Sequence, residues 1–147
     1  MNRLELTSMI LEAKRRKGLR WIDLAKAIGK SREWTAAALL GQMPLSEDDA
    51  KRIGQLLDLP AEAVEQLQWI PYRGAGTPQV PTDPVLYRFY EILLVYGPAL
   101  RALIHEDFGD GIMSAIDFQI KVERVPHPEG DRVRITLDGK FLPYRVF

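Results

Sequence analysis

The side chains best suited to chemistry lie within one short segment, residues 87–91. Arg88 and Glu91 are three residues apart, a spacing that places both on the same face of a helix. Tyr87, Phe89 and Tyr90 surround them with aromatic surface. By itself this spacing favours a surface ion pair worth about 0.3–0.5 kcal/mol. A chemical role for the pair is the alternative, and the spacing alone leaves it open.

A second candidate is Ser114, which follows the segment Gly109-Asp110-Gly111. Taken alone, it is a small residue at the start of a strand. His105 could act as its base, but the pattern of a serine nucleophile beside an oriented histidine is absent from the sequence. His105-Glu106 also lacks the second histidine of a helical zinc motif, and the chain has only two histidines.

The composition excludes several classes of site. There are no cysteines, which rules out disulfides, thiolate metal sites and thiol catalysis. No glycine-rich phosphate loop or dinucleotide motif occurs. Lys plus Arg and Asp plus Glu both number 20, so bulk charge favours neither nucleic acid nor membrane. No segment approaches the roughly 20 apolar residues of a membrane span. We therefore expect a cytoplasmic protein without a metal or other cofactor.

The candidate residues depend on the elements of the second half of the chain. Thr82-Asp83-Pro84 is a strong helix start, because a capping side chain precedes a proline of the first turn. The pattern predicts a helix over residues 85–96, a break at Gly97-Pro98, and a second helix that ends near Phe108.

Beyond the Gly-Asp-Gly turn, apolar residues recur at every second position. This predicts one strand around residues 116–123 and another over residues 132–137, closed by a turn at Asp138-Gly139. Phe141 and Leu142 would begin a last short strand. Because a sheet of two or three strands is thin and has exposed edges, we expect this half to pair with another copy of itself.

The first half reads as a bundle of five short helices. Ser31 and Ser46 are good N-caps for two of them, and residues 22–31 resemble a helix-turn-helix. A DNA-binding interpretation would place Arg32, Glu33 and Thr35 against base edges. The predicted recognition helix has little hydrogen-bonding capacity, and residues 1–75 hold 12 basic against 10 acidic side chains. The pattern therefore favours packing or assembly over DNA binding.

A segment rich in glycine and proline, residues 71–81, joins the halves. The sequence thus predicts an α+β protein with two domains. Residues 1–75 form an all-helical, helix-turn-helix-like domain. Residues 76–147 form a helix-plus-antiparallel-strand domain that carries the catalysis and dimerises.

Several longer motifs resemble the cyanase family (cyanate hydratase, or cyanate lyase). The resemblance covers nearly the whole chain and is most specific in the second half. The motifs are Ala36-Ala37-Ala38-Leu39-Leu40-Gly41-Gln42, Ile70-Pro71, Arg73-Gly74, Pro81-Thr82-Asp83-Pro84, Tyr87-Arg88-Phe89-Tyr90-Glu91, Tyr96-Gly97, His105-Glu106, Phe108-Gly109-Asp110-Gly111-Ile112, Ser114-Ala115-Ile116 and Thr136-Leu137-Asp138-Gly139-Lys140.

The resemblance implies a lyase whose catalytic residues are Arg88, Glu91 and Ser114. It implies bicarbonate-dependent decomposition of cyanate to carbon dioxide and carbamate, which then yields ammonia and carbon dioxide. Bicarbonate is then a co-substrate, and no separate cofactor is needed. The resemblance also implies a homodecamer of five dimers, with C-terminal strands swapped between copies and active sites between subunits. We expect no nucleic-acid or membrane partner. The competing interpretation is a DNA-binding regulator whose second domain dimerises.

Residue chemistry agrees with that reaction. Arginine remains protonated and binds carboxylate-shaped anions with two parallel hydrogen bonds. Ser114 can donate its hydroxyl to a substrate atom without acting as a nucleophile. Glu91 has two open roles, orienting Arg88 or transferring a proton, and we favour the first. The single positive charge of one arginine offsets only one of the two anions. We therefore expect Arg88 of more than one subunit to contribute to each site.

Overall fold

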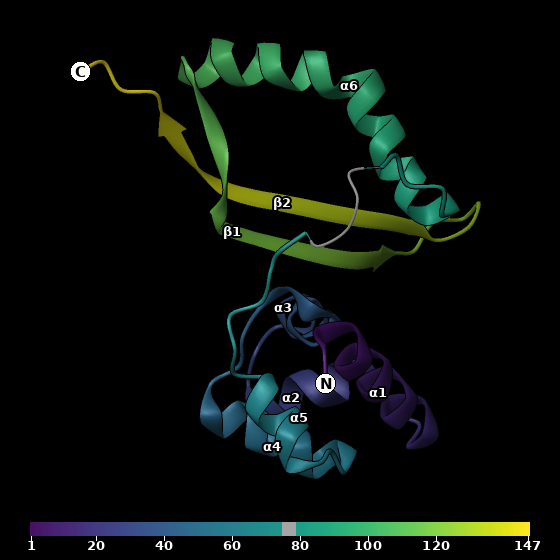
Figure 1. Cartoon of the computed structure of the whole chain (residues 1–147). Coiled ribbons are helices and arrows are strands. Elements are labelled where there is room, and N and C mark those ends of the chain that lie inside the picture. The colour runs from purple at the N-terminus through teal and green to yellow at the C-terminus, as the bar shows by residue number, and fades with distance from the viewer. Residues whose placement is uncertain (75–78) are drawn as a thin grey trace. The chain divides into compact units, whose positions relative to one another are not determined.

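The computed structural model describes residues 1–74 and 79–147. The chain divides into two compact units, Met1–Gly76 and Thr77–Phe147 (Figure 1).

The first unit is a bundle of short helices. In order along the chain they are α1 (Arg3–Arg16), α2 (Trp21–Ile28), α3 (Arg32–Ala37), a π-helical turn η1 (Ala38–Gln42), α4 (Glu47–Leu57) and α5 (Ala61–Gln66). The predicted caps at Ser31 and Ser46 are confirmed, because their side chains accept hydrogen bonds from the amides of Trp34 and Asp49.

Two helices of this bundle end irregularly. Helix α3 widens into η1, inside which Gly41 has a φ of 104° that other residues rarely adopt. Helix α5 ends at Gln66, and Ile70 beyond it is exposed. The core is formed by a set of fully buried apolar side chains, Leu6, Ile10, Leu24, Leu39, Ile53, Leu57 and Leu67.

Helices α4 and α5 approach each other at Gly54. A Cβ at this position would overlap Cγ2 of Val64, a branched side chain with little freedom to move. We therefore expect Gly54→Ala to lower the free energy of unfolding by about 1–3 kcal/mol, measured by chemical denaturation. Val64→Ala should suppress much of that loss in the double variant. Equal losses with and without Val64 would contradict this packing.

The second unit begins with the long helix α6 (Pro84–Phe108), and the side chain of Asp83 caps it by accepting from the amides of Val85 and Leu86. The predicted break at Gly97-Pro98 is wrong, because α6 continues through both residues. A proline inside a helix removes one hydrogen bond and crowds the preceding turn, which bends the helix without having to end it. Figure 1 shows α6 as a curved helix.

Two antiparallel strands complete this unit, β1 (Gly111–Val125) and β2 (Arg132–Pro143). The predicted turn at Asp138-Gly139 is wrong, since both residues lie inside β2, which continues through Phe141 and Leu142. The irregularity lies in β1 instead. Gly139 pairs with Phe118 and Phe141 pairs with Met113, so residues 114–117 bulge opposite Lys140 alone.

The second unit buries very little of its own surface. Among its described residues, 79–147, only Gly111 and Ser114 are buried, and no residue of α6 is. A hairpin of two strands is marginally stable in water without a packed apolar face. This fold therefore leaves most of the apolar surface of α6 and of the hairpin uncovered.

Candidate functional site

Arg88 and Glu91 form the ion pair that their spacing predicts. Nη1 of Arg88 lies 2.6 Å from Oε2 of Glu91, within one turn of α6. The Arg88 side chain is 66% exposed and that of Glu91 46% exposed. A guanidinium carries five N–H donors, and the bond to Glu91 uses one of them. The pairing therefore fixes Arg88 and leaves most of its donors open to a ligand.

An aromatic ring supports the same guanidinium. Cζ of Arg88 lies 5.2 Å from the centre of the Tyr87 ring, within the range of a cation–π contact. The Tyr87 and Tyr90 rings are 6.3 Å apart. Arg88 is thus held by a carboxylate and by an aromatic face, which limits the positions that its long side chain can adopt.

Ser114 lies in the bulge of β1 and is 4% exposed. Its Oγ accepts hydrogen bonds from the backbone amides of Ile116, at 3.0 Å, and of Asp117, at 2.9 Å. These two bonds occupy both acceptor positions of the hydroxyl. The hydroxyl proton is therefore the part of Ser114 that remains for a ligand.

Within one chain the three predicted residues form two separate groups. Arg88 and Glu91 lie in the first half of α6, and Ser114 lies on β1. Across the described ranges 1–74 and 79–147, no hydrogen bond or ion pair joins Ser114 to either of them. The spacing of residues along the sequence identified the pair, but it carried no information on where Ser114 lies relative to it.

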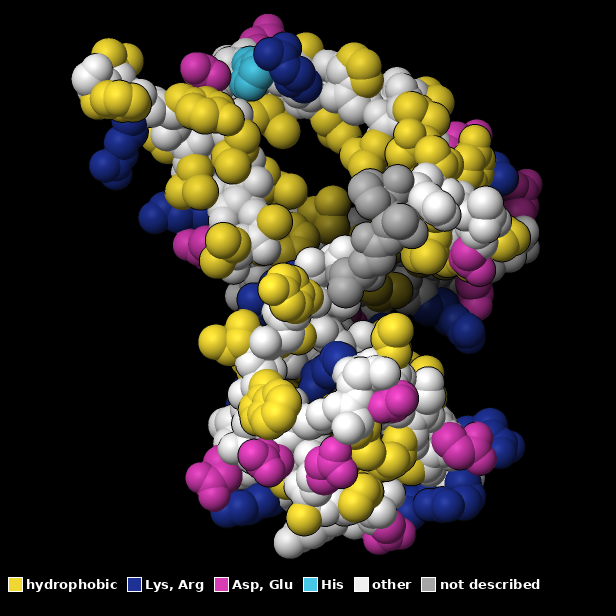
Figure 2. All heavy atoms as spheres, viewed as in Figure 1, with side chains coloured by type: hydrophobic (Ala, Val, Ile, Leu, Met, Phe, Trp, Pro, Cys, Tyr) yellow, Lys and Arg dark blue, Asp and Glu magenta, His cyan; other side chains and the backbone are white. Residues whose placement is uncertain are grey.

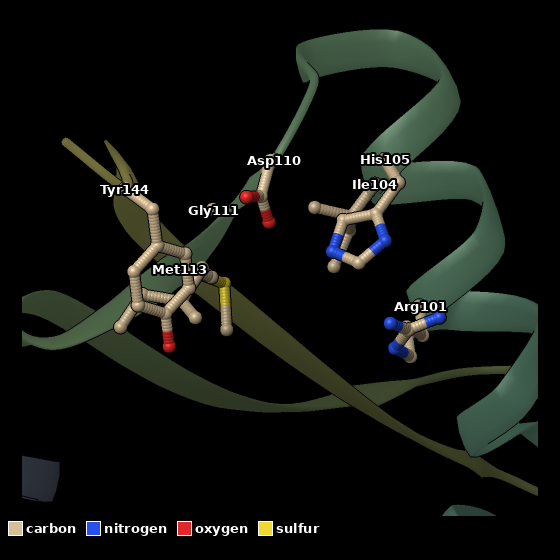
Figure 3. Close-up of a pocket in the computed structure, with 8 residues that line it drawn as sticks. Arg101, Ile104, His105, Asp110, Gly111, Met113 and Tyr144 are labelled. Atoms are coloured by element: carbon tan, nitrogen blue, oxygen red, sulfur yellow. The ribbon is translucent and has the colours of Figure 1, made fainter. Parts of the chain in front are cut away.

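A hollow of about 430 Å³ lies between the end of α6 and the strands (Figure 3). It is lined by Arg101, Ile104, His105, Asp110, Gly111, Ile112, Met113 and Tyr144. In Figure 3, Arg101 and His105 project from α6, and Met113 and Tyr144 lie across from them. None of the three predicted site residues lines this hollow. The sequence singled out His105 as a possible base for Ser114 and within an incomplete zinc motif, and no pattern singled out Arg101 or Tyr144.

The structure contradicts the DNA-binding arrangement of α3. Thr35 is fully buried, and its hydroxyl donates to the backbone oxygen of Ser31 at 2.8 Å. Glu33 forms an ion pair with Arg32 at 3.4 Å. Of the three side chains expected to face bases, Thr35 therefore cannot, because it is part of the core.

Exposed apolar side chains run the length of α6. Phe89, Leu93, Tyr96, Leu100 and Leu103 alternate at spacings of four and three residues, so they form one stripe along the helix. All five are between 44% and 60% exposed. We call these five residues the α6 stripe. Figure 2 shows an opening between the helix and the strands with apolar side chains around it.

Two absences apply to the residues that the structure describes, 1–74 and 79–147. Among these residues, no group of three or more His, Asp or Glu side chains is arranged to hold a metal ion. In the same part of the chain, no helix has the length and apolarity to cross a membrane.

Comparison with known proteins gives the same family for both units. The family model for the "Cyanate hydratase, N-terminal" region matches residues 3–71, and the model for the "Cyanate lyase C-terminal domain" matches residues 78–146. Cyanate hydratases of Thiobacillus denitrificans and Dechloromonas aromatica are 59% and 58% identical over 147 residues, which is all of this chain and all of each relative.

A solved structure agrees with the sequence matches. The crystal structure of cyanase from T. urticae superposes with a TM-score of 0.79 at 39% identity, over 94% of this chain and 96% of that one. The α+β fold predicted from the sequence, helices first and then a helix with antiparallel strands, is confirmed.

Proposed function

The chain belongs to the cyanate hydratase family, and from that premise we propose that it is a lyase that decomposes cyanate with bicarbonate as co-substrate. Bicarbonate attacks the cyanate carbon, and the adduct takes up one proton from solvent and gives carbon dioxide and carbamate. Carbamate then falls apart to ammonia and a second carbon dioxide. The observation that best supports this chemistry is the Arg88–Glu91 pair, which offers a fixed guanidinium with open donors.

The reaction needs fixed positive charge because both substrates are monoanions. Bringing them together is repulsive, and further charge develops on the oxygens and nitrogen of the adduct. A guanidinium offsets this repulsion, and its planar fork matches the two oxygens of bicarbonate. We assign Arg88 as this anion-binding group.

Glu91 acts as a positioning residue in this proposal. A free carboxylate beside two anions would oppose their binding. The 2.6 Å bond to Arg88 directs the charge of Glu91 toward the guanidinium and fixes which donors face outward. This geometry supports the orienting role over proton transfer.

Ser114 supplies a hydrogen bond to the substrate in the same proposal. Because both of its acceptor positions are occupied by amides, its hydroxyl is arranged to donate and not to accept. A donor is what an anionic oxygen or the nitrogen of cyanate requires.

The complete site forms only in an oligomer. The α6 stripe and several apolar side chains of the hairpin, among them Ile116, Val133 and Leu137, are exposed in one chain. This exposure supports a large apolar interface with other copies. Pairing of the hairpin with a second copy would extend a two-stranded sheet that is marginal alone. We propose dimers with swapped C-terminal units, assembled as a decamer of five, with sites that combine Arg88 and Ser114 of different subunits.

Ammonia release tests the reaction directly. Purified protein, freed of dissolved carbon dioxide, should release ammonia from cyanate only after bicarbonate is added, and the rate should saturate in both anions. Turnover at the same rate without bicarbonate would exclude it as a co-substrate. No consumption of cyanate with both anions present would exclude the proposed function.

Variants of Ser114 test the donor role. We expect Ser114→Ala to lower kcat by about 10²–10³-fold, as loss of one donor to a developing anion does in other enzymes. Ser114→Thr keeps the hydroxyl and should retain much more activity than Ser114→Ala. Equal rates for the two variants would contradict a role for the hydroxyl.

A further inference from the structure

We propose that Gly139 is a positioning residue for Ser114, because only a residue without a side chain lets β2 pass the bulge that prepares the Ser114 hydroxyl as a donor. The inference rests on the proposed function, in which Ser114 donates to the substrate. The inference adds a residue of β2 that does not contact the substrate and acts through Ser114.

The register of the hairpin places a bulge in β1 opposite one residue of β2. Residues 114–117 of β1 face Lys140 alone on β2, between the Met113–Phe141 and Phe118–Gly139 pairs. The surplus residues cannot continue the ladder, so the backbone of β1 folds back locally. This fold brings the amides of Ile116 and Asp117 to Oγ of Ser114. The bulge is therefore what occupies the acceptor positions of the Ser114 hydroxyl and leaves it as a donor.

Strand β2 leaves no room for a side chain beside the bulge. A Cβ at Gly139 would overlap the backbone oxygen of Ser114 and would lie 2.6 Å from Cγ of Met113. Met113 ends in a flexible chain and can move. The Ser114 oxygen belongs to the backbone of the bulge itself, so relieving that overlap would displace Ser114.

The φ of Gly139 does not by itself require glycine. Six of the described glycines have a positive φ, and Gly139 is not one of them. The φ of Gly139 is therefore one that alanine can adopt. What excludes a side chain is the contact with Ser114, so a substitution should act first on that residue.

The experiment is a double-variant cycle on the full-length protein in its assembled state. Bicarbonate-dependent kcat is measured for the wild type, Gly139→Ala, Ser114→Ala and the double variant. We expect Gly139→Ala to lower kcat at least about tenfold and Ser114→Ala to lower it further. The double variant should be no slower than Ser114→Ala, because the group that Gly139 positions is already gone.

Two additional proteins separate positioning from general damage. Ser114→Thr keeps a hydroxyl, so Gly139→Ala should still lower its kcat. Gly111→Ala is a matched control in the same hairpin, because its Cβ would overlap the backbone oxygen of Leu142 rather than Ser114. The double variant of Gly111→Ala and Ser114→Ala should therefore show the product of the two single losses of kcat.

The outcomes are distinct. A double variant that loses the product of the two single effects would overturn the inference, as would a Gly139→Ala protein with wild-type kcat. If Gly139→Ala fails to assemble, Gly139 is needed to form the β-hairpin and not specifically to position Ser114. That result also overturns the inference. A wild-type protein that consumes no cyanate with bicarbonate refutes the proposed function instead.

Discussion

Arg88→Ala is expected to lower bicarbonate-dependent ammonia release by about a thousandfold or more, because the guanidinium that offsets the charge of both anions is lost. The fold should be unaffected. Arg88 is 66% exposed, and exposed ion pairs contribute about 0–1 kcal/mol to stability. The measurement is steady-state kinetics together with thermal unfolding and the oligomeric mass of the same preparation.

Arg88→Lys is the matched control for the geometry of the guanidinium. It keeps the positive charge but cannot form two parallel hydrogen bonds to one anion. We expect it to remain strongly impaired, although less than Arg88→Ala. An Arg88→Lys protein with wild-type kcat and KM would show that charge alone is sufficient, and an active Arg88→Ala protein would remove Arg88 from the site.

Leu93→Lys is expected to dissociate the oligomer and abolish activity with it. Leu93 is at the centre of the α6 stripe and is 60% exposed in one chain. If the stripe is an interface, a lysine there would have to lose its hydration without a partner, which is strongly unfavourable. Light scattering coupled to size exclusion gives the mass, and the ammonia assay gives the activity.

Leu93→Met is the control that distinguishes loss of the apolar interface from the effect of any substitution at this position. Methionine is apolar and of similar volume, so mass and activity should stay near those of the wild type. If Leu93→Lys also keeps the wild-type mass, the α6 stripe is not an interface and the assembly must use another surface.

The local structure of this chain could be read from its sequence where a side chain acts on its neighbours. Ser31, Ser46 and Asp83 cap helices by bonding to amides two or three residues ahead, and such bonds depend only on local sequence. The Arg88–Glu91 bond has the same origin, because one helical turn brings the two side chains together.

Features that depend on distant residues could not be read in this way. Pro98 interrupts the helical pattern, yet α6 continues through it. Gly139 resembles a turn residue because Asp-Gly is common in turns, but it lies inside β2, where a Cβ would overlap the backbone of the β1 bulge. Ser114 and Arg88 could not be related from the sequence either. Within the described residues of one chain no hydrogen bond or ion pair joins them, and we propose that they meet from different copies.

Mixing inactive variants tests most directly whether Arg88 and Ser114 of different copies share a site. Arg88→Ala and Ser114→Ala are purified separately, dissociated together under mild conditions, and reassembled. Mixed oligomers then contain sites that pair an intact Arg88 from one copy with an intact Ser114 from another. We predict that bicarbonate-dependent ammonia release returns in the mixture and in neither variant reassembled alone. If the mixed oligomers form and remain as inactive as their parents, a site shared between copies is contradicted.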